Sequence, residues 1–243
     1  MLSSWLLMSS PSAVASNRVL DALTREDRAL LEPSLQPFVM SAGDALFEAG
    51  EPITAVFFPL VGQVSLRISA EDGSEVESAS ICSDGVVGLG GLLARDVSFS
   101  RQKVQISGRA LVAQRNSFLT SVQASETLRR VLAAYHDAFA AHMLQSVFCQ
   151  AQHRAHQRIA RWLLTAFDAV MDAPLPLTQD MVAGALGVRR PTVTISLRWM
   201  ASSGLIDVGR GRIAVLNRAG LERQACPCYA IIRGGYDNIR GLN

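Results

Sequence analysis

The 243-residue sequence lacks the features of membrane and secreted proteins. No apolar run approaches the roughly 20 residues that a membrane-spanning helix needs. The first ten residues, MLSSWLLMSS, lack the basic start and the long apolar stretch of a secretion signal, so we interpret them as a frayed or docking tail. The four cysteines are too few for a disulfide framework in a chain of this length. We therefore expect a protein without membrane partners.

Lysine is nearly absent, since Lys103 is the only lysine among the 23 basic residues. Arginine suits bidentate contacts with phosphates and guanine edges, although a GC-rich genome would give the same bias. Residues 1–126 carry nine basic and fourteen acidic residues, residues 127–171 carry five and two, and residues 172–243 carry nine and five. This distribution predicts an acidic front half that avoids nucleic acid and a basic back half that can bind it.

Residues 177–218 carry the pattern that says most about function. An apolar segment of helix length ends at Gly187, the residue type best able to form the left-handed turn between two helices. A second helix is predicted from about Pro191 to Ser202, because proline is tolerated in the first turn of a helix. Its buried face is marked, at positions i, i+4 and i+7, by Val193, Leu197 and Met200. The spacing predicts a helix-turn-helix.

The outward-facing side of residues 177–218 is rich in arginine. The turn and the second helix present five polar residues: Arg189, Arg190, Thr192, Thr194 and Arg198. Two short apolar runs then flank residues 209–212, which predicts a hairpin with Arg210 and Arg212 at its tip. Together these features predict a winged helix-turn-helix whose second helix enters the major groove of double-stranded DNA. With so few cysteines, such a protein is expected in the reducing cytoplasm.

Most of the front half has the pattern of β-strands. Apolar and polar side chains alternate in residues 38–114, whereas residues 17–31 have the spacing of a helix. Glycines recur through this segment, and residues 71–74 have the composition of a hairpin turn. Many short strands with regular turns predict a small antiparallel barrel or roll, so the expected fold class is α+β.

A stretch without proline runs from Leu119 to Ala173. Steps of four and three residues define a heptad-like seam of Leu128, Leu132, Tyr135, Phe139, His142, Ser146, Cys149 and His153. The apolar surface beside it is widened by Met143, Leu144, Val147 and Phe148. Such a helix can pack on its own barrel, but its apolar breadth favours a homodimer through residues 125–153. Two-fold symmetry would then match a palindromic operator.

The long helix is expected to break near His153, and a second helix then runs to a linker at residues 172–176. We therefore divide the chain into three parts. Residues 1–124 form a sensor domain, residues 125–171 form the dimerisation and connecting helices, and residues 172–243 form the DNA-binding domain.

An acidic barrel, a long helix and a winged helix-turn-helix, in this order, resemble the Crp/Fnr family of bacterial transcription regulators. Four stretches carry the resemblance: residues 41–52 (SAGDALFEAGEP), 56–64 (VFFPLVGQV), 157–164 (QRIARWLL) and 177–187. The chain looks most similar to a branch with Cys-x-x-x-His before the third stretch and Cys-x-Cys-Tyr near the C-terminus. The resemblance implies a cyclic-nucleotide-binding-like β-roll, a dimer that binds DNA, and RNA polymerase as a further partner.

The start of the family's recognition helix is matched by Arg189, Arg190, Thr192 and Thr194. By resemblance, Arg190 corresponds to the arginine that reads a guanine. Pro191 stands where cyclic-AMP-responsive members have a base-contacting glutamate, and Ile195 stands where they have a second arginine. We therefore expect a half-site that differs from theirs. Arg210 and Arg212 are expected to contact phosphates, which position the protein without specifying sequence.

The candidate effector pocket consists of Gly88, Leu89, Gly90, Gly91, Ser100 and Arg101. Leu89 stands where cyclic-nucleotide-binding members have a glutamate for a ribose hydroxyl, and the register of Arg101 differs from that of their phosphate-binding arginine. The glycines suit either an anion nest or a tight barrel corner. No cysteine precedes Cys82, so the iron–sulfur cluster of other members is not expected. The effector is therefore unknown.

The pairs Cys149/His153 and Cys226/Cys228 leave two interpretations open. Each pair could bind a metal or act as a thiol switch, but we favour a capping role for His153 and buried packing for the cysteines, with Cys226 and Cys228 against the wing. No metal or cofactor is predicted. No catalytic residue is predicted either, because no local base accompanies the thiols of Cys226 and Cys228. The sequence thus predicts a homodimeric transcription regulator and no enzyme. The alternatives are a small-molecule receptor with ligand-conditional DNA binding and a thiol- or metal-responsive switch.

Overall fold

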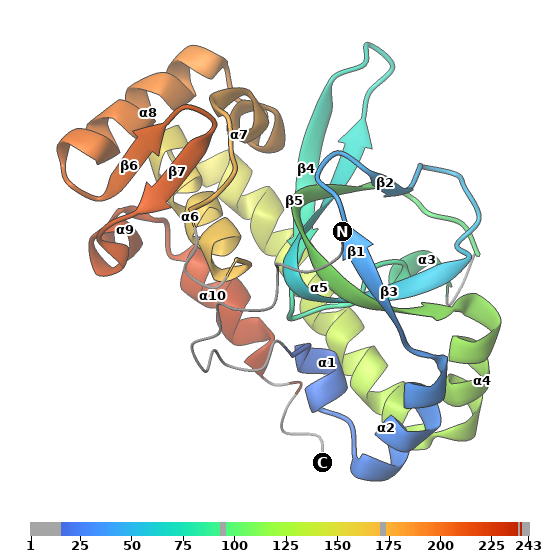
Figure 1. The fold of residues 1–243 in the computed structure, drawn as a ribbon. Helices are drawn as coiled ribbons and strands as arrows, with labels where there is room; N and C mark the ends of the chain where they lie inside the picture. The colour runs from blue at the N-terminus through green and yellow to red at the C-terminus, as the bar shows by residue number, and fades with distance from the viewer. Residues whose placement is uncertain (1–15, 93–95, 171–173, 238, 240–243) are drawn as a thin grey trace, which may run out of the picture.

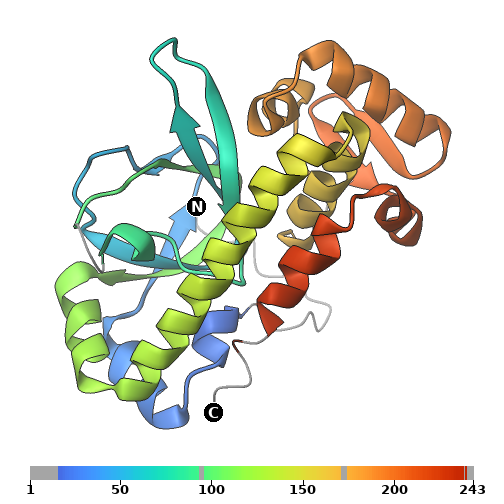
Figure 2. The same ribbon diagram turned by 180° about the vertical axis from the view of Figure 1, so that it is seen from behind.

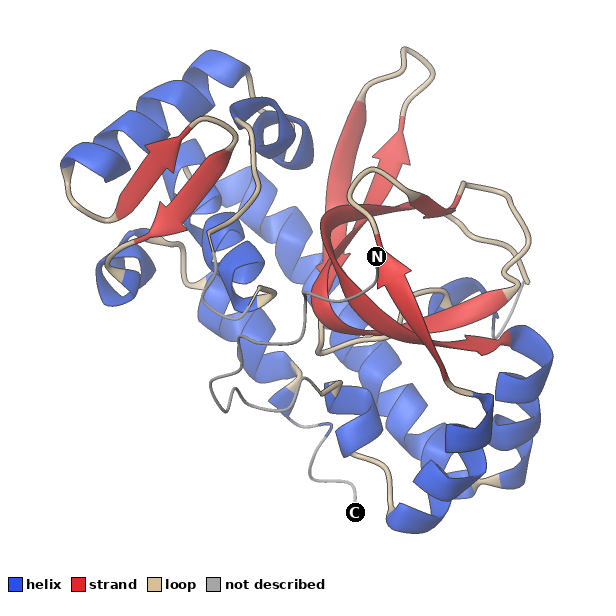
Figure 3. Ribbon diagram, viewed as in Figure 1, coloured by secondary structure: helices blue, strands red, loops and turns tan. Residues whose placement is uncertain are grey.

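A computed structural model describes residues 16–92, 96–170, 174–237 and 239 of the chain (Figure 1). The first ten residues, expected to form a tail, lie outside this described part. The front half is a curled antiparallel sheet with helices beside it, and the back half is helical with one small hairpin (Figure 3). The α+β fold class expected from the sequence is confirmed.

The described part of the chain begins with two short helices where the sequence suggested one over residues 17–31. These are α1 (Arg18–Asp21) and α2 (Arg25–Leu31). The second starts at a new cap, since Oγ1 of Thr24 accepts the backbone N–H of Asp27 at 3.1 Å. A threonine in this position satisfies an N–H group that a helix leaves without a partner. The prediction of a single helix is therefore wrong, because Thr24 caps a second helix and apolar spacing alone does not reveal such a cap.

Five strands form one antiparallel sheet in the order β1-β5-β3-β4, with β2 paired to β5. After a 3-10 turn (Glu32–Ser34), the elements of this region are β1 (Gln36–Met40), β2 (Ala45–Phe47), β3 (Ala55–Ser69), β4 (Glu75–Ile81), the one-turn helix α3 (Leu89–Leu92) and β5 (Arg101–Gln114). The turn expected at residues 71–74 joins β3 to β4. Val64 and Leu66 are buried in the apolar core of the curled sheet, which we call the β-roll.

The opposite face of β3 is buried as well, which simple alternation does not predict. Ser65 is fully enclosed, and its Oγ donates to Oε2 of Glu77 on β4 at 2.6 Å. The indole N–H of Trp162 in the back half donates to Oε1 of the same carboxylate at 2.9 Å. The backbone N–H of Gly62 donates to the carbonyl of Ala169 at 2.8 Å. The back half is therefore docked on the β3–β4 side of the β-roll.

Two helices follow the β-roll, α4 (Arg115–Ala124) and the long α5 (Glu126–Gln152). Oγ of Ser125 accepts the N–H of Leu128 at 2.9 Å and so caps α5. The predicted heptad seam of α5 faces inward: seven of its residues are buried in the chain itself, namely Leu128, Leu132, Tyr135, Phe139, His142, Ser146 and Cys149. The seam therefore packs on its own chain, as a helix against its own barrel would, and the homodimer through residues 125–153 stays a prediction.

Of the four residues predicted to widen the seam, Met143 is half-buried against the first core and the other three are exposed. Leu144, Val147 and Phe148 are 73%, 69% and 52% exposed. They lie on the C-terminal part of α5, which runs diagonally across the molecule in the view of Figure 2. A helix face that exposes three large apolar side chains within five residues is unusual for a monomer surface.

The back half packs around a second apolar core. Its elements are α6 (Ala155–Asp168), α7 (Gln179–Leu186), α8 (Arg190–Ser202), β6 (Ile206–Gly209), β7 (Arg212–Val215), α9 (Arg218–Gln224) and α10 (Cys228–Gly235). The expected helix break lies at His153, between α5 and α6. The last helix, α10, returns to lie beside α5 (Figures 1 and 2). None of the described helices is both long and apolar enough to cross a membrane.

Candidate nucleic-acid interface

The helix-turn-helix has the geometry that the sequence predicts. Gly187 ends α7 in a left-handed conformation, with φ of 60°, which glycine adopts without strain. Pro191 lies in the first turn of α8, where its missing N–H costs no hydrogen bond. The expected inner face of α8 is buried at Val193, Leu197 and Met200. Because the glycine turn and the apolar spacing are local signals, the sequence alone could locate both helices.

In the views of Figures 1 and 2, α8 lies on the side of the back half away from the β-roll. Pro191, Ile195 and Arg198 form an exposed stripe along its outer face. Trp199 is 44% exposed beside it and meets the ring of His156 edge to face. Trp199 was not among the residues predicted from the sequence. It could have been noticed as a large apolar residue outside the buried i, i+4, i+7 spacing.

The N-terminus of α8 is rich in groups that bind anions. Arg189 caps the helix without a side-chain hydrogen bond, and both Arg189 and Arg190 are exposed. The first backbone N–H groups of a helix have no partner within it, and the helix dipole is positive there. This end of α8 therefore favours a phosphate.

Two of the predicted contact residues also hold α7 and α8 together. Nε of Arg190 lies 3.3 Å from Oδ1 of Asp180 at the start of α7, and both side chains are about two-thirds exposed. An ion pair this exposed is weak and can exchange for another anion. Oγ1 of Thr194 lies 2.6 Å from Oε1 of Gln179, and Thr192 and Thr194 are half-buried. Thr194 thus contributes to the packing of α7 against α8.

The wing is the two-stranded hairpin β6–β7, as predicted. Gly211 makes its turn with φ of 69°. Arg210 is exposed at the tip, and Arg212 forms an exposed ion pair with Asp207, with 3.4 Å between Nη2 and Oδ2. A hollow of about 300 Å³ separates this tip from the starts of α7 and α8 and is lined by Arg190 and Arg210. The arginines of helix and wing therefore border one concave surface.

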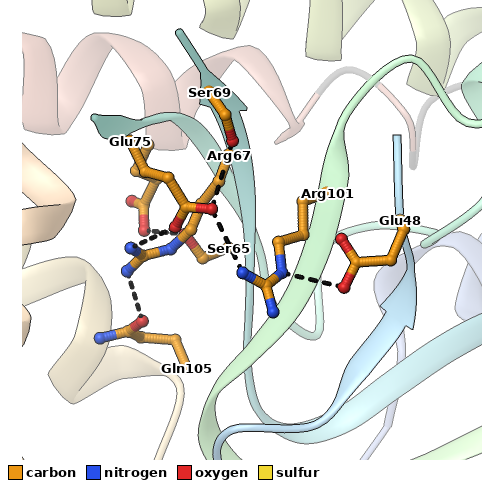
Figure 4. A network of polar contacts seen from close by, with 8 residues as sticks. Glu48, Ser65, Arg67, Ser69, Glu75, Arg101 and Gln105 are labelled. Atoms are coloured by element: carbon orange, nitrogen blue, oxygen red, sulfur yellow. Dashed lines mark hydrogen bonds and ion pairs between the residues drawn. The ribbon is translucent and has the colours of Figure 1, made fainter. Parts of the chain in front are cut away.

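The predicted effector pocket lies inside the β-roll, but its arginine is already engaged. Arg101 pairs with Glu48 at 3.2 Å through Nε and with Glu75 at 3.2 Å through Nη1 (Figure 4). Glu75 also pairs with Arg67 at 3.5 Å. The two arginines lower the pKa of Glu75 against the opposing effect of burial. Arg101 is therefore held by one carboxylate from β4 and one from the residue that follows β2.

The glycines of this pocket are closely packed. A Cβ on Gly88 would lie 2.8 Å from the carbonyl oxygen of Ala55, and one on Gly91 would lie 2.1 Å from that of Val97. Leu89 and Ser100 are buried. The hollow beside Gly88, Leu89 and Gly90 measures about 20 Å³, which is room for about one water molecule. Of the two interpretations from the sequence, this conformation favours the tight barrel corner.

The cysteines are placed differently from the expectation. Cys226 and Cys228 do not pack on the wing but meet Cys149 at the end of α5. His153 is the C-cap residue of α5, and its Nδ1 lies 3.5 Å from Sγ of Cys228. The pairs Cys149/His153 and Cys226/Cys228 could not be connected from the sequence, because 73 residues separate His153 from Cys226 and no local pattern links them.

Comparisons with known proteins agree with this geometry. Residues 157–224 match the Crp-like helix-turn-helix domain family. The fold is similar to that of FixK2 from Bradyrhizobium japonicum, with 19% identity, a TM-score of 0.63, and coverage of 79% of this chain and 98% of the other. A Crp/Fnr-family transcriptional regulator from Thermus thermophilus is 23% identical, with a TM-score of 0.60 and coverage of 78% and 98%.

A c-di-GMP-responsive global regulator from Xanthomonas campestris is also similar, with 16% identity, a TM-score of 0.60, and coverage of 79% and 99%. No curated protein matches the sequence. The order of β-roll, long helix and winged helix-turn-helix is therefore confirmed by fold, and the domain family of the back half is confirmed by sequence. Residues 157–224 thus match the Crp-like helix-turn-helix domain, and the fold of the chain is similar to those of Crp/Fnr-family regulators.

Proposed function

We propose that the protein is a homodimeric transcription regulator that binds a palindromic DNA operator through α8. The observation that carries this proposal is the concave surface between α8 and the wing, bordered by Arg190 and Arg210. Arg190 is about two-thirds exposed, and its one ion pair is exposed too. A basic helix N-terminus of this kind can enter the major groove, where arginine binds guanine in a bidentate manner.

The residues of this surface divide into two roles. Arg189, Arg190 and Arg198 lie on the turn and helix and are placed to reach bases or nearby phosphates. Arg210 and Arg212 lie on the wing and are placed to bind the backbone outside the groove. Ile195 offers an apolar contact where the relatives recognised from sequence have an arginine. We therefore propose a half-site that includes a thymine methyl group near Ile195.

Dimerisation is supported by the exposed apolar face of α5. The side chains of Leu144, Val147 and Phe148 would be covered if two α5 helices packed about a two-fold axis. Such an axis would present two α8 helices to half-sites about 34 Å apart. RNA polymerase as a further partner, a cytoplasmic location and the three-part domain division remain predictions from the sequence.

The engaged Arg101 and the closely packed glycines favour DNA binding that needs no cyclic nucleotide in the β-roll. The alternative is a receptor whose pocket opens on binding a small molecule. Binding of the ligand-free protein to an operator at full strength would support the first interpretation. A requirement for an added metabolite would support the second.

The test is a fluorescence-anisotropy titration on an operator selected from random palindromes. Arg190→Ala is expected to weaken binding about 10- to 100-fold, because a bidentate contact is worth about 1–3 kcal/mol. Arg25→Ala, which removes the same charge from the exposed surface of α2, is the matched control and should change affinity less than twofold. Unchanged affinity and sequence preference in Arg190→Ala would remove Arg190 from the interface.

A further inference from the structure

Four side chains that ligate soft metal ions meet where α5 ends and α10 begins. Cys149 lies in the last turn of α5 and His153 at its C-cap. Cys226 lies just before α10, and Cys228 is its first residue. The ligand atoms of all four lie within 4.8 Å of one another. The site is outside the DNA-binding surface and outside the β-roll pocket.

The distances suit a tetrahedral metal ion. Sγ of Cys149 and Sγ of Cys226 are 3.4 Å apart, and Sγ of Cys228 is 3.5 Å from Nδ1 of His153. Around Zn²⁺, bonds of about 2.3 Å to sulfur and about 2.0 Å to nitrogen give tetrahedral edges of ~3.8 Å between sulfurs and ~3.5 Å between sulfur and nitrogen. The ligand atoms therefore need to move by only a few tenths of an ångström along these two edges.

The local backbone explains how this set is assembled. Cys149 and His153 are one helical turn apart, and His153 leaves the helix with φ of −102° and ψ of 144°. Pro227 stands between the other two cysteines as the N-cap of α10, with φ of −55°. This arrangement turns both Cys226 and Cys228 toward the end of α5, since both approach its ligands.

The surroundings are dry and positively charged. The three cysteines are at most 1% exposed, whereas His153 is half-buried and leaves one edge of the site near solvent. Nε2 of Gln145 lies 3.0 Å from Sγ of Cys228 and donates to it. A donor of this kind outside the ligand set orients a thiolate.

Arg161 supplies a buried counter-charge. Its side chain is buried, forms no ion pair within the described part of the chain, and is close enough for its charge to act on Cys149. Three thiolates, a neutral imidazole and Zn²⁺ together carry one negative charge. A buried guanidinium beside such a site offsets part of that charge, and it also acts on the nearby buried carboxyl of Glu77.

We propose that Cys149, His153, Cys226 and Cys228 bind one Zn²⁺ per chain in a closed tetrahedral site that ties α10 to the end of α5. All four positions are filled by protein, as in structural rather than catalytic zinc sites. Binding releases the three thiol protons to solvent while His153 binds through Nδ1. Apart from partly buried Ile232, the small apolar cluster around these ligands consists of the cysteines themselves, so the ligand set has little apolar packing of its own.

A disulfide between Cys149 and Cys226 is the competing use of the same atoms. It would leave Cys228 and His153 without a role, although both point at the same cluster. The zinc site accounts for all four side chains.

The first experiment measures metal in the full-length protein, purified in reducing buffer without chelator from zinc-supplemented medium. Mass spectrometry of the metal content is expected to give about one Zn per chain. The chelator-stripped, reduced protein should then bind Co²⁺ with the visible absorption of a tetrahedral thiolate complex, saturating at one equivalent. Less than about 0.1 Zn per chain together with no such absorption would overturn the proposal, as would a Cys149–Cys226 disulfide in its place.

The variants assign the ligands. His153→Ala and Cys226→Ser are expected to weaken Co²⁺ binding about 100-fold or more, because even the loss of a partner outside the coordination shell costs about 10- to 100-fold. Cys82→Ser is the control, since Cys82 is buried in the front half, away from the cluster. Equal binding by Cys82→Ser and Cys226→Ser would refute the assignment. The wild-type Co²⁺ spectrum decides the question if a variant fails to fold, and no step depends on DNA binding.

Discussion

Nδ1 of His142 lies 2.9 Å from the hydroxyl oxygen of Tyr236, and this buried hydrogen bond joins the middle of α5 to the end of α10. The two rings also meet edge to face. Tyr236 also packs at a tilt against Tyr135 of α5, so the residue after α10 is fixed on the same helix that carries Cys149. The C-terminal helix is therefore attached to α5 at both of its ends.

This contact predicts a specific loss of stability in acid. Burial, assisted by the charge of Arg161, lowers the pKa of His142 to about 3 from an ordinary value of 6.5. Arg161 of α6 and Glu77 of β4 line a small hollow beside the ring. The folded state thus binds this proton less readily than the unfolded state. The stability is fully present above pH 6.5 and is lost as the pH falls from there towards 3.

His142→Gln removes the titrating group. The free energy of unfolding of the wild type should fall by about 3 kcal/mol more than that of His142→Gln between about pH 6.5 and about pH 4, since each pKa unit corresponds to about 1.4 kcal/mol. Urea unfolding at several pH values measures this difference in slope. His136→Gln, an exposed substitution on the same helix, is the control and should follow the wild type. Parallel curves for wild type and His142→Gln would show that the pKa of His142 is the same in the folded and unfolded states and so is not lowered by burial.

The closely packed glycines of the β-roll give a second prediction. Gly91→Ala should destabilise the protein by about 3 kcal/mol or more, because its Cβ would lie 2.1 Å from the carbonyl oxygen of Val97 and 2.5 Å from Cδ1 of Ile53. Gly234→Ala is the control, since nothing lies within 4 Å of the added Cβ. Thermal unfolding of both variants measures the difference. A small effect of Gly91→Ala would mean that this corner is open, and the effector pocket would have to be reconsidered.

The sequence predicts the parts of this fold that depend on local signals. Gly187 needs a left-handed turn, and Val193 and Leu197 repeat at helical spacing, so the helix-turn-helix could be located without a structure. The hairpin at residues 71–74 and the wing follow from turn composition in the same way. In each case the physical cause lies within a few residues of the feature.

Features that depend on packing between distant segments could not be predicted. The heptad spacing of α5 identifies an apolar face but not its partner, and the structure covers that face with the β-roll and α10. From the sequence, Arg101 was a candidate to bind an effector. Its ion pairs with Glu48 and Glu75 could not be seen there, because these partners lie in other strands or loops. The meeting of Cys149 with Cys226 likewise depends on the return of α10 along α5, which no local pattern encodes.

The exposed face of α5 gives the last prediction. Leu144 and Phe148 are 73% and 52% exposed in the single chain, so replacing both with serine should leave the folded monomer intact. In the proposed dimer the same side chains would be buried, and each would contribute about 1.5–3 kcal/mol if fully covered. The double variant is therefore expected to raise the dimer dissociation constant at least about 100-fold.

Sedimentation equilibrium over a range of protein concentrations measures this change. Val39→Ser, which removes a 72% exposed valine from β1, is the control and should leave the dimer unchanged. Because each half-site would then be bound separately, the double variant should also lose affinity for a palindrome while keeping its affinity for a single half-site. An unaltered dimer in the double variant would mean that another surface forms the interface, and a monomeric wild type would exclude the homodimer. The effect of replacing Leu144 and Phe148 thus decides whether two α8 helices bind the operator as a two-fold symmetric pair through this face of α5.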